Sequence, residues 1–252
     1  MAIDSHTHIN SKVLDNPSQE IKKINNHNNL EYIINVGLDI ETSIEAIKIS
    51  NENPKIYSSI GIHPLYLKNQ NIDELISLAI DNKVVAIGEI GLDSSKLNYE
   101  EQTRYLINQI IIANELHLPV IIHANNTNQE IINIFKKIVK PLYGCVFHCF
   151  QPDIESFNYL INNDYYISFA GKITYLNAKK SIEIASIVPK EQFLVETDSP
   201  FITPEPFRNE KNCSTNINYI IKRISEIRDV SYEEIEKITT TNTLRLFKNI
   251  KK

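Results

Sequence analysis

The feature that most constrains the fold is a regular alternation of short apolar runs with longer amphipathic segments. Short runs rich in β-branched residues are typical of buried strands, whereas apolar residues recurring every three or four positions are typical of helices. Repeated strand–helix units indicate a parallel sheet, because each parallel strand needs a crossover connection. The eight runs that we predict as strands are Ala2 to His6, Tyr32 to Val36, Ile56 to Ile60, Val84 to Ile87, Val120 to His123, Gly144 to His148, Tyr166 to Phe169 and Phe193 to Glu196.

Amphipathic segments follow the strands, and several of them open with Asp, Asn or Ser, which cap free backbone N–H groups. The segments between strands are Ser18 to Asn28, Glu41 to Asn53, Ile72 to Asn82, Tyr99 to His117, Asn128 to Val139, Ile154 to Asn163 and Asn177 to Ser186. Three further helices are expected to close the chain, at Asn216 to Arg228, Ser231 to Thr240 and Asn242 to Asn249. Eight repeats in 252 residues without a linker predict an α/β protein, a single-domain TIM-like (β/α)8 barrel over residues 1–252.

Composition limits the possible functions. The net charge of −5 excludes a broad basic face, so any phosphate group would have to be bound locally. No segment is long and apolar enough to suggest a membrane span, and the N-terminus lacks the pattern of a signal peptide. We therefore expect a cytoplasmic protein that does not bind membranes.

The three cysteines, Cys145, Cys149 and Cys213, form no CxxC motif, and their odd number argues against a disulfide framework. Cys145 and Cys149 flank His148, which allows a zinc site. Small apolar residues on a buried strand account equally well for this spacing, and we favour that interpretation.

Polar residues gather where the predicted strands end. In a parallel β/α barrel these carboxyl ends meet at one mouth, which is where catalytic groups lie. His6 and His8 are two positions apart on the first strand, so their side chains point to the same side. Five of the seven histidines and two carboxylates occupy such positions: His6, His8, His63, His123, His148, Glu89 and Asp198.

A metal site explains this grouping better than separate hydrogen-bonded side chains do. Burying several imidazoles and carboxylates together without a cation strongly disfavours their charged states. For His63 and Asp93 individually, a hydrogen-bonded polar group is an equally good interpretation. His27 and His117 lie at the ends of predicted helices, where a histidine interacts favourably with the helix dipole, and we leave them out of the site.

The strand-end motifs together resemble those of a known family, and their order and spacing run nearly from end to end. They are Asp4-x-His6-x-His8, Gly61-Ile62-His63-Pro64, Gly88-Glu89-Ile90-Gly91-Leu92-Asp93, Leu118-Pro119-Val120-Ile121-Ile122-His123, His148-Cys149-Phe150, Glu196-Thr197-Asp198-Ser199-Pro200 and Asn242-x-x-Arg245-Leu246-Phe247. This set resembles the TatD-like deoxyribonucleases, metal-dependent hydrolases of the amidohydrolase superfamily.

The resemblance implies a TIM-like barrel that carries two divalent cations, which can be Zn, Mg, Mn or Co. The six implied ligands are His6, His8 and Asp198 for one cation, His123 and His148 for the other, and Glu89 as the bridge between them. Asp198 and Glu89 would be the catalytic carboxylates, with Asp198 accepting a proton from the attacking water. His63 would lie beside the substrate, and Asp4 would orient an imidazole.

The implied reaction is hydrolysis of phosphodiester bonds, from the 3′ end of single-stranded DNA, with no obligate protein partner. This chain departs from the family pattern at the mouth: Asn125 replaces an arginine, Ser94-Ser95 replaces aromatic residues, and Gln151-Pro152 replaces Ser-Gly. Replacement contacts to the substrate could come from Lys172, Arg208 or Asn212, but for each of them we favour the interpretation as a solvated surface residue.

Two other functions are compatible with the same residues. A metal-dependent amidohydrolase or esterase acting on a small amide, lactone or ester would use the same cations with a different rim. A metal-stabilised binding protein without turnover is also possible, although all of the implied ligands are present.

Overall fold

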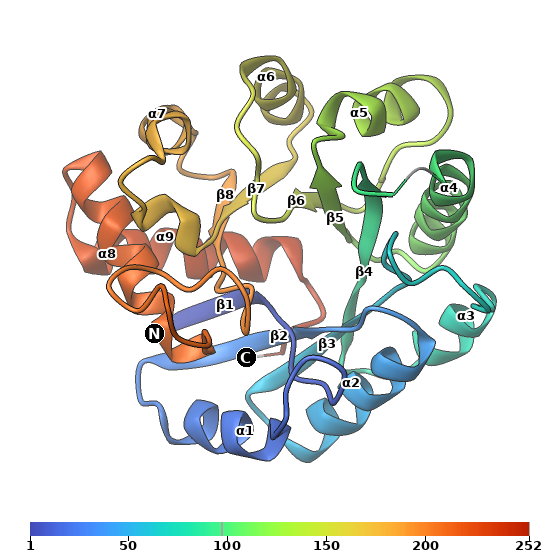
Figure 1. Ribbon diagram of the computed structural model, residues 1–252, viewed down its shortest axis with the longest axis horizontal. Helices are drawn as coiled ribbons and strands as arrows, with labels where there is room; N and C mark the ends of the chain where they lie inside the picture. Colours follow the sequence, from blue (N-terminus) through green and yellow to red (C-terminus); the bar gives the residue numbers. More distant parts are fainter. Residues whose placement is uncertain (97, 252) are drawn as a thin grey trace.

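The computed structural model describes residues 1–96 and 98–251. Eight parallel strands pair in the order in which they occur in the chain, and helices surround them (Figure 1). The strands are β1 (Ala2–Thr7), β2 (Leu30–Val36), β3 (Ile56–Ile60), β4 (Val84–Asp93), β5 (Val120–Asn125), β6 (Cys145–Phe147), β7 (Tyr166–Phe169) and β8 (Phe193–Val195). The predicted TIM-like (β/α)8 fold is confirmed.

The first and last strands of the sheet, β1 and β8, meet at their carboxyl ends. Thr7 forms an isolated parallel bridge with Ser199. The amide of His8 donates to the carbonyl of Ser199 at 2.7 Å, and the amide of Asp198 donates to the carbonyl of His6 at 2.9 Å. These bonds nearly close the barrel and bring Asp198 beside the two N-terminal histidines.

Nine α-helices lie in the described part of the chain. They are α1 (Pro17–Asn26), α2 (Ile40–Glu52), α3 (Glu74–Leu78), α4 (Tyr99–Glu115), α5 (Asn128–Lys137), α6 (Ile154–Asn162), α7 (Lys179–Ile187), α8 (Ile217–Arg228) and α9 (Tyr232–Leu246), with short 3-10 turns η1 (Gly171–Thr174) and η2 (Ser214–Asn216). Local sequence sets several starts: the side chains of Asp39, Asp153 and Ser231 cap α2, α6 and α9.

The prediction of two separate helices at the C-terminus is wrong, because α9 runs unbroken through Asn242. We expected this asparagine to begin a new helix. Its side-chain amide instead points into the protein and donates to the carbonyls of Lys190 at 2.8 Å and Phe193 at 2.9 Å. A tertiary contact therefore keeps a polar residue inside the helix.

The prediction of a helix over Ile72 to Asn82 is also too long, since α3 covers only Glu74–Leu78. At its two ends, side chains accept backbone N–H groups. Asn71 Oδ1 accepts from the amide of Asp73 at 3.3 Å, and Asp81 Oδ1 accepts from the amide of Lys83 at 2.9 Å. Such local bonds offer the backbone an alternative to the helix.

The fourth strand, predicted as Val84 to Ile87, extends to Asp93. Gly91 lies in this extension and lets β4 and β5 approach closely, because a Cβ on it would lie 1.8 Å from the carbonyl oxygen of His123. The extension matters because it carries both Glu89 and Asp93 along the edge of the mouth.

The apolar core has two layers on opposite sides of the strands. The outer layer lies between strands and helices and includes Ile122, Leu106 and Ile220. The inner layer fills the barrel with residues that alternate with the outer ones along each strand. Its members are Ile34, Val36, Tyr57, Val85, Ala86, Ile121, Val146, Tyr166, Leu194, Leu246, Phe247 and Ile250.

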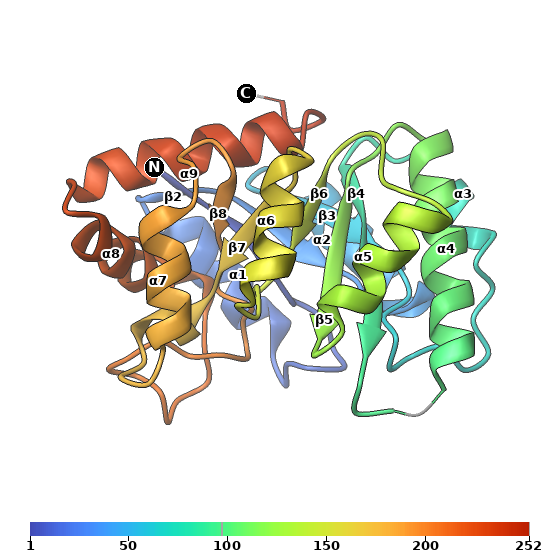
Figure 2. The same ribbon diagram turned by 90° about the horizontal axis from the view of Figure 1, so that it is seen from above.

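The last part of the chain closes one end of this inner layer. Leu246, Phe247 and Ile250 are buried against the strand residues of the barrel interior. Figure 2 shows α9 lying across this end, whereas the long loop that follows β8 extends from the opposite end. The mouth formed by the carboxyl ends of the strands is therefore the end left for a site.

Candidate metal centre

The strand period places polar side chains directly above the inner apolar layer. His123, His148 and Glu196 each follow an inward-facing apolar residue by two positions: Ile121, Val146 and Leu194 respectively. Because alternate residues of a strand share a face, these three polar side chains also point inward. The result is one polar layer at the mouth of the barrel.

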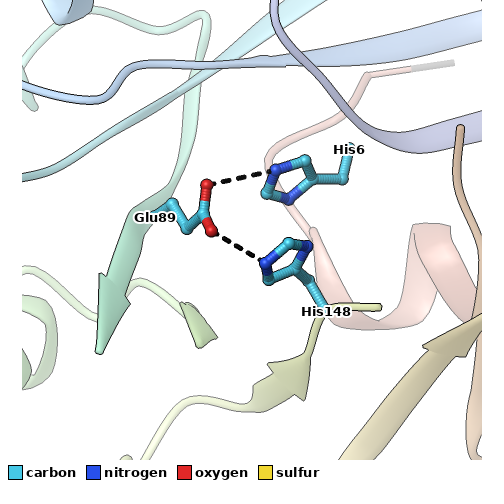
Figure 3. A group of neighbouring side chains, drawn as sticks. All are labelled: His6, Glu89 and His148. Carbon is cyan, nitrogen blue, oxygen red and sulfur yellow. Dashed lines mark ion pairs between the residues drawn. The ribbon is translucent and has the colours of Figure 1, made fainter. Parts of the chain in front are cut away.

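Glu89 lies at the centre of this layer and is 2% exposed. Its two carboxylate oxygens face different histidines (Figure 3). Oε2 is 3.4 Å from His6 Nε2 and 3.6 Å from His8 Nε2. Oε1 is 2.7 Å from both His123 Nδ1 and His148 Nε2. One carboxylate therefore joins two groups of donors.

The first group combines His6 and His8 with Asp198. The Nε2 atoms of the two histidines are 3.1 Å apart. Asp198 Oδ1 is 3.6 Å from the first of these nitrogens and 3.5 Å from the second. Three donor atoms at these separations could hold one metal ion.

The second group consists of His123 and His148. His123 Nδ1 and His148 Nε2 are 3.3 Å apart, and both face the same oxygen of Glu89. All six residues implied as ligands by the sequence resemblance are thus brought together around Glu89.

Hydrogen bonds on the outer side fix which nitrogen faces the centre. His123 Nε2 is 2.9 Å from Asp93 Oδ2, and His148 Nδ1 is 3.3 Å from Glu196 Oε1. His8 Nδ1 is 2.9 Å from the carbonyl of Val36. Since a carboxylate or carbonyl oxygen can only accept, the outer nitrogen carries the proton, and a neutral ring turns its lone pair inward.

This convergence of lone pairs needs a positive charge. Imidazole lone pairs and carboxylate oxygens repel one another when they are buried at these distances without a cation. In the absence of a metal, protons take that place: burial lowers the pKa of His148, but the nearby carboxylates of Glu89 and Glu196 outweigh burial and raise that pKa well above its ordinary value. For Glu89 burial acts in the opposite direction and raises the pKa, but the surrounding histidines outweigh burial and hold this pKa well below its usual range. The donor set therefore fits divalent cations.

His63 lies beside the second group but is oriented differently. Its Nε2 is 3.5 Å from Glu89 Oε1. Its Nδ1 accepts the backbone N–H of Leu65 at 3.1 Å, so in the neutral ring Nε2 must carry the proton. Burial lowers the pKa of His63, which favours this neutral form. His63 therefore offers a hydrogen-bond donor to the centre and no lone pair.

Three further carboxylates lie close to the centre: Glu196, Asp93 and Asp4. Glu196 Oε1 faces His148 and also accepts the amide of Cys149 at 2.7 Å, while Oε2 accepts from Ser168 at 2.5 Å. Asp93 holds His123. Asp4 was expected to orient an imidazole, but it accepts from the hydroxyl of Thr197 at 2.6 Å and from that residue's amide at 2.9 Å.

The three residues considered as substrate contacts have different surroundings. Lys172 is exposed in η1. The guanidinium of Arg208 lies 4.2 Å from the centroid of the Tyr175 ring. Asn212 is buried and has no free polar atom: it donates to the carbonyls of Thr197 and Phe201 and accepts from Cys213 and Asn216. Asn212 thus organises the loop after β8 and offers no donor to a substrate.

The altered rim is held by amide hydrogen bonds. Asn125 donates to Asp93 Oδ1 at 3.1 Å and accepts from Gln151 Nε2 at 3.1 Å. Asp93 Oδ1 also accepts the amide of Ser95 at 2.8 Å. This side of the mouth is therefore polar, and its amides surround the carboxylate of Asp93.

The cysteines do not join the centre. All three are free, and Cys145 is fully buried in the apolar core. Burial raises the pKa of the Cys149 thiol to about 12, so this group stays protonated at neutral pH. Neither residue is suited to act as a thiolate ligand or nucleophile.

A parallel β/α barrel with imidazole and carboxylate donors at its mouth is the architecture of a metal-dependent hydrolase. The model of the family described as TatD related DNase matches residues 3–248. The chain therefore belongs to this family, and it is a metal-dependent hydrolase. None of the helices in the described ranges combines the length and apolar character needed to cross a bilayer.

Individual relatives agree over nearly the whole length. The chain is 35% identical over 253 residues to the uncharacterized metal-dependent hydrolase YabD of Bacillus subtilis (strain 168), covering 98% of this chain and 99% of the relative. It is 30% identical to YcfH of Escherichia coli (strain K12), another uncharacterized metal-dependent hydrolase, covering 97% and 95%. Among solved structures, the TatD homologue YjjV of Escherichia coli K12 superposes with a TM-score of 0.89 at 25% identity, covering 98% of each chain.

Proposed function

We propose that this protein is a divalent-metal-dependent nuclease that hydrolyses phosphodiester bonds at the 3′ end of single-stranded DNA. The observation that carries the proposal is the placement of Glu89 between two groups of donors, since two adjacent cations suit phosphodiester hydrolysis. The family description supports a nucleic-acid substrate. Residues 1–252 would act as one catalytic domain without a protein partner.

The distances around Glu89 support the ligands that we propose. His6, His8 and Asp198 would hold one cation, His123 and His148 would hold the second, and Glu89 would contact both. When bound, the cations would polarise the phosphoryl group and lower the pKa of the attacking water. The buried carboxylates of Glu89 and Asp198 supply the compensating negative charge, and the neutral imidazoles supply lone pairs.

The chain's own residues would perform the remaining steps. Asp198 is 7% exposed, which leaves its carboxylate accessible from the mouth as an acceptor for the proton of water. The Nε2–H group of His63, which faces Glu89 Oε1 in the structure, would instead donate a hydrogen bond to a phosphoryl oxygen of the bound substrate. Neither step requires a covalent intermediate on the protein.

A cleavage assay tests this proposal. Protein stripped with a chelator and reloaded separately with Mg, Mn, Co or Zn should shorten a 5′-labelled single-stranded oligonucleotide one nucleotide at a time. The 3′ end should be consumed first, and the stripped protein should be inactive. Digestion that starts internally would contradict the polarity, and the absence of cleavage with every metal would contradict the nuclease proposal.

The amide-lined rim favours one alternative, a metal-dependent amidohydrolase or esterase for a small substrate. Asn125 donates to Asp93 and accepts from Gln151, so neither of these two amides supplies a positive charge to a phosphate group. A parallel panel of ester, lactone and amide substrates distinguishes the two functions. Faster turnover of any of these than of the oligonucleotide would favour the alternative.

The contact between Glu196 and His148 gives a prediction about metal affinity. In Glu196→Gln the imidazole loses its charged acceptor, and we expect affinity for the second cation to fall by about 10- to 100-fold. Competition with a chromophoric chelator measures this change. The matched control is Glu52→Gln, which alters an exposed residue at the end of α2; equal affinities in both variants would exclude a role for Glu196.

A further inference from the structure

Two partly exposed aromatic rings each lie next to a histidine of the metal centre. Phe201 is 48% exposed and Tyr66 is 37% exposed. The Phe201 ring lies 6.0 Å from the His8 ring at an interplanar angle of 66°, and the Tyr66 ring lies 5.8 Å from the His63 ring at 69°. Each ring thus contacts a histidine of the centre with its edge or face while another part of it remains open to solvent.

Backbone hydrogen bonds hold both aromatic residues next to the centre. The amide of Phe201 donates to the carbonyl of Asp198 at 2.8 Å, and its carbonyl accepts from Asn212 Nδ2 at 2.7 Å. The amide of Tyr66 donates to the carbonyl of His63 at 2.9 Å. Each aromatic residue is therefore tied to a residue of the centre, so its distance from the reacting groups is set by the fold.

Electrostatics alone provides little for binding a nucleic acid here. The chain carries a net charge of −5, and Asn125 at the rim faces the carboxylate of Asp93. Arg208 is 3.9 Å from Glu205, which offsets its charge. A substrate with both phosphates and bases must therefore gain affinity from contacts other than a basic groove, and bases stack on aromatic rings regardless of sequence.

We propose that Phe201 and Tyr66 are stacking platforms for the bases of the nucleotides that flank the scissile phosphodiester. This inference rests on the proposed nuclease function and specifies its substrate class. Only unpaired bases expose a face to a ring, so the two platforms select single-stranded ends over duplex. Because one ring lies beside His8 and the other beside His63, each stacked base would lie next to a histidine of the centre.

Binding measurements with matched oligonucleotides test the platforms. We expect Phe201→Leu and Tyr66→Leu each to weaken binding of a single-stranded oligonucleotide by about 5- to 100-fold. The conservative variant Phe201→Tyr should bind like the original protein. Fluorescence anisotropy on metal-loaded protein reports affinity, with phosphorothioates at the last linkages to slow hydrolysis.

The substrate itself provides the decisive control. When the two terminal nucleotides lack their bases, Phe201→Leu and Tyr66→Leu should bind no more weakly than the original protein. Tyr143→Leu is the matched protein control, because Tyr143 is also 37% exposed and packs against a histidine, His117, away from the mouth.

The outcomes separate this inference from the proposed function. Equal affinity of the original protein for oligonucleotides with and without terminal bases overturns the stacking platforms even if cleavage occurs. An equal loss with both oligonucleotides in the leucine variants also overturns them. Base-dependent binding without cleavage under any metal supports the platforms and contradicts only the nuclease function.

Discussion

Replacing Glu89 with glutamine should lower the rate of oligonucleotide hydrolysis by about 10³-fold. Glu89 is the only carboxylate whose two oxygens face both donor groups among the described residues. Glutamine keeps the size of the side chain but removes the negative charge. It also replaces one carboxylate oxygen with an NH2 group. This group has no lone pair to offer a cation, so glutamine cannot bridge two cations.

Two measurements check this expectation. Steady-state kinetics should show the loss in kcat/KM, and elemental analysis of dialysed protein should show fewer bound metal ions per chain than in the original protein. The far-ultraviolet circular dichroism spectrum should be unchanged, because the substitution does not alter packing. The control is again Glu52→Gln; a Glu89→Gln protein that keeps full metal content and activity would refute the bridging assignment.

Much of the centre could be predicted because strand geometry is simple. A histidine two positions after an inward-facing apolar residue must itself face inward, which is why His123 and His148 could be placed from sequence alone. The same rule applies to Glu196, two positions after Leu194, and it could have identified this partner of His148. The sequence therefore contains a signal for Glu196, although the resemblance to the family assigns a ligand role only to Asp198.

Other features depended on contacts that the local sequence does not contain. His123 faces the centre with Nδ1 and His148 with Nε2, and only the positions of Asp93 and Glu196 in the folded barrel determine this difference. The unbroken α9 depends in the same way on carbonyls some fifty residues away, which Asn242 reaches with its side chain. Local propensity cannot report such partners.

The largest expected effect on stability comes from the end of the barrel opposite the metal centre. Phe247 is completely buried and belongs to the inner layer, together with strand residues such as Val85 and Leu194. Phe247→Ala would leave a cavity that the surrounding strands cannot close, because their hydrogen bonds hold them in place. We expect the free energy of unfolding to fall by about 3–5 kcal/mol.

Urea denaturation of metal-free protein measures this loss, as a lower midpoint with an unchanged slope. Ile80→Ala is the control, since Ile80 is 81% exposed and its truncation should change stability by less than about 0.5 kcal/mol. A loss below about 1 kcal/mol for Phe247→Ala would mean that the C-terminal segment does not close the core.

The same variant also tests whether stability and chemistry are separated along the barrel axis. Within the inner layer, Ile121, Val146 and Leu194 lie between Phe247 and the donors at the mouth. Well below its unfolding temperature, Phe247→Ala should therefore bind metal with the affinity of the original protein. Weakened metal binding in the folded variant would show that the cavity shifts the inner layer and, through it, the side chains of His123 and His148. These two histidines follow Ile121 and Val146 of the layer by two positions.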